Sequence, residues 1–350
     1  MNEIKKYVQG EEWDAYGRNH HGATFAHALA WGESLAETYG LPIFRLAITD
    51  KSSRSLNGIL PLMLFAAPGK DKRLISLPYT DAAGIVADDR TGGNILLASA
   101  FELALALGAR HIELRQAGDL PFDLAPGDAR DCWHHVAHTF KTGLRRPLPV
   151  SVGELWATLP AKVRNQVRKA RASGCTVVIG GGELLDDFYA VFSENMRDLG
   201  SPVHAEELMR RLLNKTSLYA RVIVVRLAAK PVAASIVFRQ GATLGNPWAS
   251  SLRSYRPACP NMLLYWAMLE LALGEGCRWF DFGRSSPGAP TCRFKSQWGA
   301  SMEPLTWHVF SQKPHRWDPL SETLVDAEWQ SLDLAVSRRK GPNLRRWISL

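Results

Sequence analysis

Two segments about half the chain apart have the same pattern, and this internal repeat is the feature that most constrains the fold. Their sequences are ELALALGARHIELR at 102–115 and ELALGEGCRWFDFG at 270–283. Each begins as a helix rich in alanine and leucine, stops at a glycine, and continues as a strand in which an acidic residue lies between apolar ones. Chance similarity between two such helices is the alternative, but it does not account for the shared order of elements. We therefore expect two copies of one fold.

A predicted β-hairpin precedes each copy of the repeat. In the first half IFRLAITD and NGILPLMLF flank KSSRSL, and in the second ARVIVVRL and PVAASIVFR flank AAK. This order predicts an α/β (α+β) fold of two tandem domains, with mixed, mostly antiparallel sheets flanked by helices. Pro147 and Pro149 are expected to interrupt regular structure between the halves. We therefore expect domains at 1–149 and 150–312, followed by a basic C-terminal extension at 313–350.

Composition and charge restrict the classes of function. The 350 residues have a formal net charge of +8, which favours anionic partners such as tRNA, nucleotide-linked carriers or anionic lipid. The beginning of the chain has no signal-peptide pattern, and no apolar run is long enough to span a membrane. None of the five cysteines forms a CxxC pair, which is typical of a reducing compartment. We expect a cytoplasmic protein, with at most peripheral contact with an anionic membrane and with no DNA partner.

The stretch WFDFGRSSPGAPTCRFKSQWG at 279–299 places an acid, three cations and two aromatic residues at the end of one predicted strand. Its DFG tripeptide does not indicate a protein kinase, because the chain lacks the glycine-rich loop, the β3 lysine and the HRD-type loop of kinases. Asp281 alternates with Phe280 and Phe282, so its side chain is expected on the opposite face of the strand. We expect a loop over 283–295.

These motifs resemble those of the FemAB family, whose members contain tandem domains of the N-acetyltransferase (GNAT) fold. The matching stretches are ATFAHALAW (23–31), FKTGLRRPLP (140–149), LPAKVRNQVRKARASG (159–174), MRDLGSPVH (196–204), NMLLYWAMLELA (261–272) and FDFGRSSPGAPTCRFKSQWGA (280–300). The chain looks most similar to the FemAB-like proteins of exosortase/PEP-CTERM and exopolysaccharide systems. The resemblance implies transfer of an acyl or aminoacyl group, from acyl-CoA or aminoacyl-tRNA, to an amine on a cell-envelope, peptidoglycan-like or exopolysaccharide-related acceptor.

The resemblance implies no permanently bound cofactor, and it leaves one alternative of another class. That alternative is a non-catalytic adaptor of envelope or exopolysaccharide assembly that kept the GNAT fold and lost transfer.

Lys295 and Asp281 are the candidate catalytic residues. Lys295 follows Phe294, and this pair matches the Phe-Lys pair near the proposed reaction centre of the Fem ligases. Acyl transfer passes through an oxyanion, which a fixed cation stabilises; a rim lysine lying over Trp298 is the alternative. Asp281 is a candidate general base or orienting residue for the attacking amine. Its alternative role is an ion pair with Arg284 or Arg293 that fixes the loop.

Candidate substrate-binding residues lie in further segments. The predicted helix at 161–171 has an apolar stripe flanked by cations, which indicates either a phosphate-contacting ridge or a solvated face. The loop LRSYRPACPN lies where the GNAT fold usually binds a pyrophosphate, but it lacks the glycine-rich pattern, and two prolines remove amide donors. The candidates are Phe294, Arg293, Arg284, Trp298, Trp248, Ser250, Tyr255, Arg256, Lys162, Arg164, Arg168 and Lys169.

No metal site is expected. The segment HHVAH at 134–138 has histidines four residues apart but lacks the glutamate of a zincin helix, and its neighbours predict a strand. The three glycines of IGGGELL at 179–185 lack nucleotide-binding spacing and predict a turn before a helix.

Overall fold

The chain divides into two compact units. A computed structural model describes residues 2–4, 10–50, 55–118, 120–123, 133–215, 218–313 and 326–349. The first unit comprises Met1–Thr142, Glu303–Pro319 and Ser349–Leu350, and the second comprises Gly143–Met302 and Leu320–Ile348. The expected domain limits at 149 and 312 stay a prediction, and residues 314–325 of the expected C-terminal extension lie outside the described residues.

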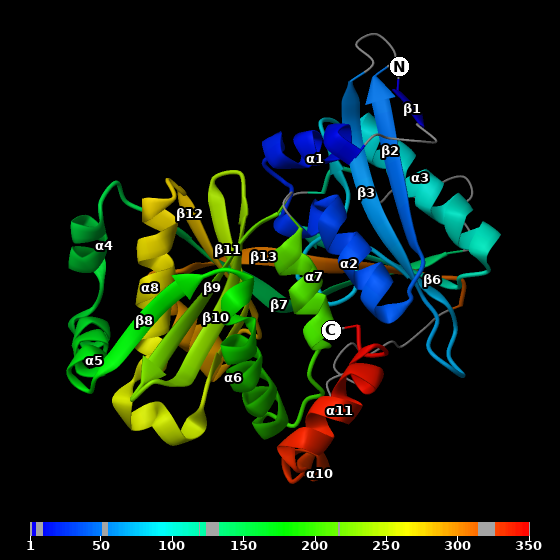
Figure 1. The fold of residues 1–350 in the computed structure, drawn as a ribbon. Helices are drawn as coiled ribbons and strands as arrows, with labels where there is room; N and C mark the ends of the chain where they lie inside the picture. The colour runs from blue at the N-terminus through cyan, green and yellow to red at the C-terminus, as the bar shows by residue number, and fades with distance from the viewer. Residues whose placement is uncertain are drawn as a thin grey trace. The chain divides into compact units, whose positions relative to one another are not determined.

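The first unit is a mostly antiparallel sheet with helices on both faces (Figure 1). Its elements are β1 (Asn2–Ile4), α1 (Gly10–Asn19), η1 (Phe25–His27), α2 (Leu29–Tyr39), β2 (Ile43–Asp50), β3 (Leu56–Phe65), β4 (Arg73–Ile75), β5 (Val86–Ala87), α3 (Arg90–Leu107), β6 (His111–Ala117) and β13 (Ser301–Ser311). The strand order is β1-β2-β3-β4-β6-β13, with β5 paired to β3. Along β3, Leu60 and Leu62 share a core with α3 whereas Ile59 shares one with α1, as the two-residue period of a strand requires.

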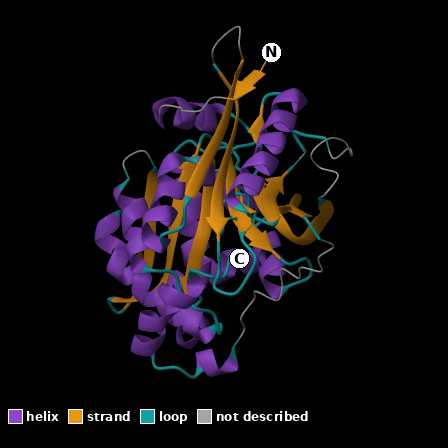
Figure 2. Ribbon diagram, turned by 90° about the vertical axis from the view of Figure 1, so that its right-hand side faces the viewer, coloured by secondary structure: helices purple, strands orange, loops and turns teal. Residues whose placement is uncertain are grey.

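The second unit is also built on a mostly antiparallel sheet, which lies between helices (Figure 2). Its elements are β7 (His134–Pro147, which begins in the first unit), α4 (Val152–Thr158), α5 (Ala161–Ala172), β8 (Cys175–Gly180), η2 (Gly182–Leu184), α6 (Leu185–Asp198), α7 (Glu206–Asn214), β9 (Tyr219–Leu227), β10 (Lys230–Gln240), β11 (Thr243–Ser251), η3 (Arg253–Ala258), α8 (Pro260–Gly274), β12 (Trp279–Ser285), α9 (Pro290–Ser296), α10 (Ala327–Gln330) and α11 (Leu334–Arg345). The order β12-β11-β10-β9-β8 is antiparallel except for the β11–β12 pair. The apolar helix α8 is buried in the core on one face, and α6 packs against the other.

The predicted fold class is confirmed, and the repeat appears in the structure as α3 followed by β6 and α8 followed by β12. The two predicted hairpins are β2–β3 and β9–β10, and the HHVAH segment belongs to β7. Gly108 ends α3 with φ 65°, a left-handed conformation that costs a glycine little. In the second copy Gly274 is the last helical residue, and Gly276 adopts the left-handed conformation with φ 69°.

One local prediction is confirmed and another is wrong. Pro147 is the last residue of β7, and residues 148–151 between β7 and α4 have no regular structure, as expected. The segment 283–295 is not wholly a loop, because residues Pro290–Ser296 form α9, with Pro290 at a first-turn position that needs no amide donor. Within the described residues, no helix is long and apolar enough to cross a membrane.

Candidate functional site in the second unit

The candidate active site lies where β12 ends and α9 begins. The parallel strands β11 and β12 pair over Thr243–Gly245 and Trp279–Asp281, although both continue past these residues. The strands therefore diverge after Asp281, and their main-chain groups beyond this point no longer pair with each other. Such a gap between strands allows a ligand with amide groups to pair with a strand.

Asp281 braces Gly283, a left-handed residue within the same strand β12. Its Oδ1 accepts a hydrogen bond of 2.8 Å from the backbone N–H of Gly283, which has φ 70°. A left-handed residue is tolerated at this position because glycine has no Cβ. Phe280 and Phe282 are completely buried on the core side, whereas Asp281 is partly exposed, as the predicted alternation requires.

The two cations of α9 bind carbonyl oxygens that precede the helix, one at the end of β12 and one in the following loop. Lys295 Nζ donates to the carbonyl of Arg284 at 2.7 Å, and Arg293 Nη1 donates to the carbonyl of Gly288 at 2.6 Å. The structure therefore joins Lys295 to the Arg284 carbonyl and Arg293 to the Gly288 carbonyl, and the expected convergence of Asp281 with these cations stays a prediction. The bond to Arg284 fixes the half-buried ammonium and uses one of its three donors.

Aromatic residues support α9 from the core. Phe294 packs edge-on against Tyr265 with ring centroids 4.9 Å apart, and Trp298 stacks on Tyr265 at 6.1 Å. Trp298 has no exposed surface. It therefore packs under α9 in this structure and does not line an open donor site, whereas Phe294 is partly exposed.

Tyr265 is a residue of this site that sequence reasoning missed. Burial raises the pKa of its hydroxyl to about 12, and the hydroxyl shares a hydrogen bond with the side chain of Asn246. Asn246 follows Gly245, the last residue of β11 that pairs with β12. A neutral phenol therefore lies at the point where the strands diverge. Within an apolar helix motif, Tyr265 has no sequence signal that distinguishes it from a core aromatic residue.

Trp248 and Ser250 lie on β11 but pack against other elements. Trp248 contacts the rings of His204 and Phe238, with centroids 6.1 and 6.0 Å away. The Ser250 hydroxyl accepts a hydrogen bond of 3.1 Å from Asn195 on α6. Both residues are buried, so their role in substrate binding stays a prediction.

Tyr255 and Arg256 lie on η3, directly before α8. The Lys230 ammonium lies 5.3 Å from the centre of the Tyr255 ring, and Arg256 is exposed. Cys259, with φ 57°, then leads into Pro260 at the N-terminus of α8. The expected anion-binding loop is thus a short, proline-containing helical turn.

The four candidate cations of the predicted 161–171 helix are all on α5. Val163, Val167 and Ala170 form the buried stripe, as predicted. Two of the cations contact α4, because Arg164 Nη1 donates to the Ala157 carbonyl at 3.3 Å and Arg168 lies 5.4 Å from the Trp156 ring centre. Lys162 and Lys169 are exposed. The predicted site residues therefore fall into four groups, on β12–α9, β11, η3 and α5.

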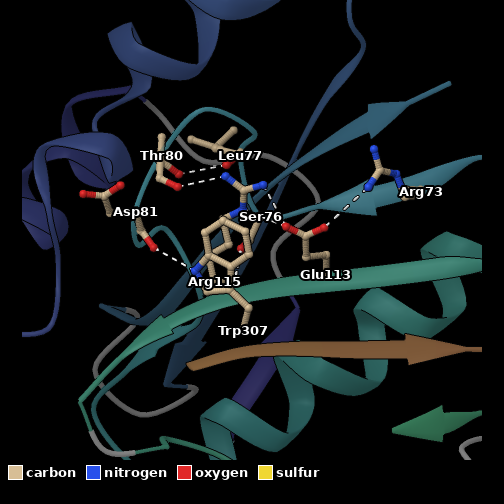
Figure 3. Close-up of polar contacts among 8 residues, drawn as sticks. All are labelled: Arg73, Ser76, Leu77, Thr80, Asp81, Glu113, Arg115 and Trp307. Carbon is tan, nitrogen blue, oxygen red and sulfur yellow. Dashed lines mark hydrogen bonds and ion pairs between the residues drawn. The ribbon is translucent and has the colours of Figure 1, made fainter. Parts of the chain in front are cut away.

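The first unit contains a buried charge cluster that sequence reasoning missed (Figure 3). Arg115 is completely buried; its Nε donates to Glu113 Oε1 and its Nη1 to the Thr80 carbonyl, both at 2.8 Å. Its guanidinium lies over the Trp307 ring, 3.9 Å from the centroid. Arg73 lies 3.9 Å from the other oxygen of Glu113.

This cluster holds a strained loop over residues 76–85. Leu77 (φ 54°) and Tyr79 (φ 66°) are left-handed residues other than glycine, and both are buried. The Trp307 indole donates to the Asp81 carbonyl at 3.1 Å, and the Thr80 hydroxyl donates to the Leu77 carbonyl at 2.8 Å. Such conformations persist only where the surroundings over-determine them, so this loop is rigid.

Two histidines of the first unit, His27 and His308, are buried. Among the described residues, no group of three or more His, Cys, Asp or Glu could hold a metal ion. His135 and His308 stack with ring centroids 5.2 Å apart, and one nitrogen of each is 3.0 Å from the other. The buried His27 binds the Gly84 carbonyl at 3.0 Å, and burial lowers its pKa to about 4.

Comparison with known families and structures now connects this site with a known domain. Residues 160–296 match the family described as acetyltransferase (GNAT) domain, a range that contains β11, α8, β12 and α9. No curated protein sequence matches the chain.

Solved structures share the fold over most of the chain at low sequence identity. FemX aligns with a TM-score of 0.68 and 15% identity, over 87% of this chain and 96% of FemX. The C-terminal domain of a proposed lysylphosphatidylglycerol synthetase from Agrobacterium fabrum aligns with a TM-score of 0.55 and 12% identity, over 87% and 91%. A tandem GNAT protein from the clavulanic acid biosynthesis pathway aligns with a TM-score of 0.50 and 13% identity, over 90% and 100%. Residues 160–296 are therefore similar to a GNAT acetyltransferase domain, and the chain shares its fold with FemX and with a tandem GNAT protein.

Proposed function

We propose that the chain is a FemAB-like N-acyltransferase whose reaction centre is the β12–α9 site. The observation that best supports this function is the position of that site inside the GNAT domain match, at the divergence of β11 and β12. The donor is an acyl-CoA or an aminoacyl-tRNA. The acceptor is an amine on a cell-envelope or exopolysaccharide precursor, in an exosortase/PEP-CTERM type of system.

The chemistry of this site would follow from its two charged groups. A neutral amine attacks the donor carbonyl, and the carbonyl oxygen becomes an oxyanion that the Lys295 ammonium stabilises. Asp281, directly or through water, accepts the proton that the attacking nitrogen loses. The C–O bond to tRNA or the C–S bond to coenzyme A then breaks, and the leaving oxygen or sulfur takes a proton. The products are an amide and the free carrier.

The region around η3 bears on the choice of donor. Pro257 lies in η3 and Pro260 begins α8, and neither has an amide to donate to a pyrophosphate. This favours an aminoacyl-tRNA donor over acyl-CoA, and the net charge of +8 is consistent with tRNA binding. Titration with uncharged tRNA and with coenzyme A, in separate experiments, measures this preference.

Replacement of Lys295 by methionine tests the function. The change keeps the apolar stem and removes the ammonium, so it should lower the single-turnover rate by roughly 10²–10³-fold, as loss of one oxyanion donor does. Donor affinity should change much less, because a fixed charge acts mainly on the transition state. Screening aminoacyl-tRNAs and acyl-CoAs for binding identifies the donor for this assay.

Arg278→Gln is the control, since Arg278 is an exposed cation of the same unit that directly precedes β12, at the end of this strand away from α9. It should keep transfer close to the wild-type rate. A wild-type rate in Lys295→Met would show that the ammonium only holds the loop.

One observation favours a non-catalytic adaptor as a second candidate. Both α9 cations bind main-chain carbonyls of the segment before the helix, which gives them a structural role without any reaction. Tight donor binding by the wild-type protein, with no transfer to any amine acceptor, would favour the adaptor.

A further inference from the structure

We propose that the outer edge of β8, with the groove beside it, binds an extended acidic peptide segment of a partner protein as an added strand. This inference concerns a different part of the second unit and goes beyond the proposed acyl transfer. We define the β8 groove by the residues that line it, which are Arg171, Val177, Ile179, Leu263, Ala267 and Glu270, with Cys175 at the start of the strand.

The edge of β8 lacks the usual protection against strand addition. β8 is the terminal strand of its sheet and pairs with β9 from Cys175 to Gly180. Edge strands are commonly protected by lysines, prolines or inward-pointing charges. The sequence of β8 is CTVVIG, which has no charged residue and no proline. Ile179 is 43% exposed on this strand.

The groove is positioned to receive the side chains of an added strand. Cys175, Val177 and Ile179 alternate along β8 and line the groove, so an added strand would point every second side chain to the same face. Those side chains would pack against Leu263 and Ala267 of α8. The groove volume is about 380 Å³. Because a cavity of about 150 Å³ holds a benzene molecule, this volume accommodates more than one apolar side chain.

Charge around the groove favours an acidic partner. Helix α5 has five cations in twelve residues, and one of them, Arg171, lies at the groove. Arg171 lies 3.8 Å from Glu270 of α8, and both side chains are partly exposed. Acidic residues flanking the apolar positions of a peptide would meet this positive surface.

The same charge disfavours a second copy of the chain. Pairing of β8 with β8 of another copy would add a second basic helix α5 beside the same sheet. Like charges at an interface are unfavourable. An acidic peptide supplies the opposite charge and also uses the main-chain groups of the strand edge, which gives affinity that a lipid chain in the groove would lack.

Selection from a phage-displayed library of random ten-residue peptides tests the proposal. We expect enrichment of peptides with apolar residues at alternate positions and acidic flanks. A synthetic peptide of the selected sequence should bind at least about tenfold more weakly to Ile179→Lys, measured by isothermal titration calorimetry. Ile179 is exposed, so this variant should remain folded. Leu199→Lys, at a similarly exposed apolar residue on the same unit, is the matched control and should bind normally.

N-methylation of the peptide tests for strand pairing directly. Methyl groups on the amides of one alternate set should abolish binding, while methyl groups on the other set should be tolerated. Calorimetry that shows no difference between the two sets would exclude pairing with the β8 edge.

Three other outcomes overturn the proposal. The first is the absence of enriched peptides, or enriched peptides that bind Ile179→Lys as well as wild type. The second is a concentration-dependent dimer, seen by analytical ultracentrifugation, that Ile179→Lys converts to monomer, because this identifies a second copy as the occupant. The third is binding of phosphatidylglycerol vesicles that Ile179→Lys abolishes while the peptides do not bind. All three leave the acyl-transfer proposal unaffected, since the variants lie outside β12 and α9.

Discussion

At the residue scale, the Asp281 carboxylate combines two properties that substitutions can separate. It accepts a hydrogen bond from Gly283, and it can take up a proton from an attacking amine. An asparagine keeps an acceptor oxygen but loses the charge and the ability to take up a proton. An alanine loses both.

We expect Asp281→Asn to keep the local conformation at Gly283 and to lose acyl-transfer activity. Hydrogen exchange at Gly283 should stay slow, while the single-turnover rate falls by roughly 10²–10⁴-fold, the contribution of a general base. Asp281→Ala should also increase exchange over residues 283–289, because the accepting oxygen is gone. Wild-type turnover in Asp281→Asn would rule out a role as base, and slow exchange in Asp281→Ala would rule out a role as brace.

The buried pair of Arg115 and Glu113 gives a second prediction at this scale. Arg115→Met leaves the Glu113 carboxylate buried without its main partner, so the free energy of unfolding should fall by about 3–5 kcal/mol. Arg110→Gln is the matched control, because Arg110 forms an ion pair with Asp71 in which both side chains are about half exposed. The control should cost less than about 1 kcal/mol. Urea denaturation measures both values, and equal costs would contradict the importance of the buried pair.

At the scale of the element, helix α5 stabilises the unit through one face and presents charge on the others. Its buried stripe of Val163, Val167 and Ala170 packs in the same core as α8. The cations lie outside this stripe, so packing does not require their charge. Substitutions of these cations can therefore test donor or acceptor binding without changing the stability of the unit.

Replacement of Arg164, Arg168 and Lys169 by glutamine should weaken anion binding more than folding. The melting temperature should stay within a few degrees, because exposed substitutions cost about 0.5 kcal/mol or less each. Affinity for tRNA should fall, and its dependence on salt should become weaker. The control replaces Arg339 and Lys340, two exposed cations of α11. Unchanged affinity in the α5 variant would make this surface an ordinary solvated face.

At the scale of the whole molecule, buried neutral histidines make stability depend on pH. Burial lowers the pKa of His27 and of His308 to about 4, and burial also lowers the pKa of His204 well below 6.5. Between about pH 6.5 and 4 the unfolded chain binds protons that the folded chain does not. The contribution of these neutral histidines to the free energy of unfolding is therefore fully present above about pH 6.5, and it is lost as pH falls towards 4.

His308→Gln should make this loss less steep. Removing one such histidine should reduce the slope of unfolding free energy against pH by up to about 1.4 kcal/mol per pH unit within this window. Urea denaturation at pH 7.5, 6 and 5 measures the slope. The exposed His134→Gln serves as control and should keep the wild-type slope. An unchanged slope in His308→Gln would show that His308 does not contribute.

The periodic parts of this protein could be predicted from sequence because their signals are local. The apolar runs of β2, β3, β9 and β10, and the glycine that ends α3, are signals that depend on residues within one element. The internal repeat then predicted two copies of one fold. For the same reason Asp281 could be placed opposite Phe280 and Phe282 without any knowledge of the tertiary structure.

The tertiary structure alone decided which side chains meet across elements. Trp298 was a candidate substrate-binding residue by sequence, and in the structure it is completely buried and stacks on Tyr265 of α8. The Arg115 cluster joins β6, the loop at 76–85 and Trp307 of β13, and no local sequence pattern predicts it. Such contacts depend on how distant segments pack, and packing decides whether a polar or aromatic side chain is in the core or in a site. The sequence by itself determined the elements and their repeat, and tertiary packing determined the environment of each functional group.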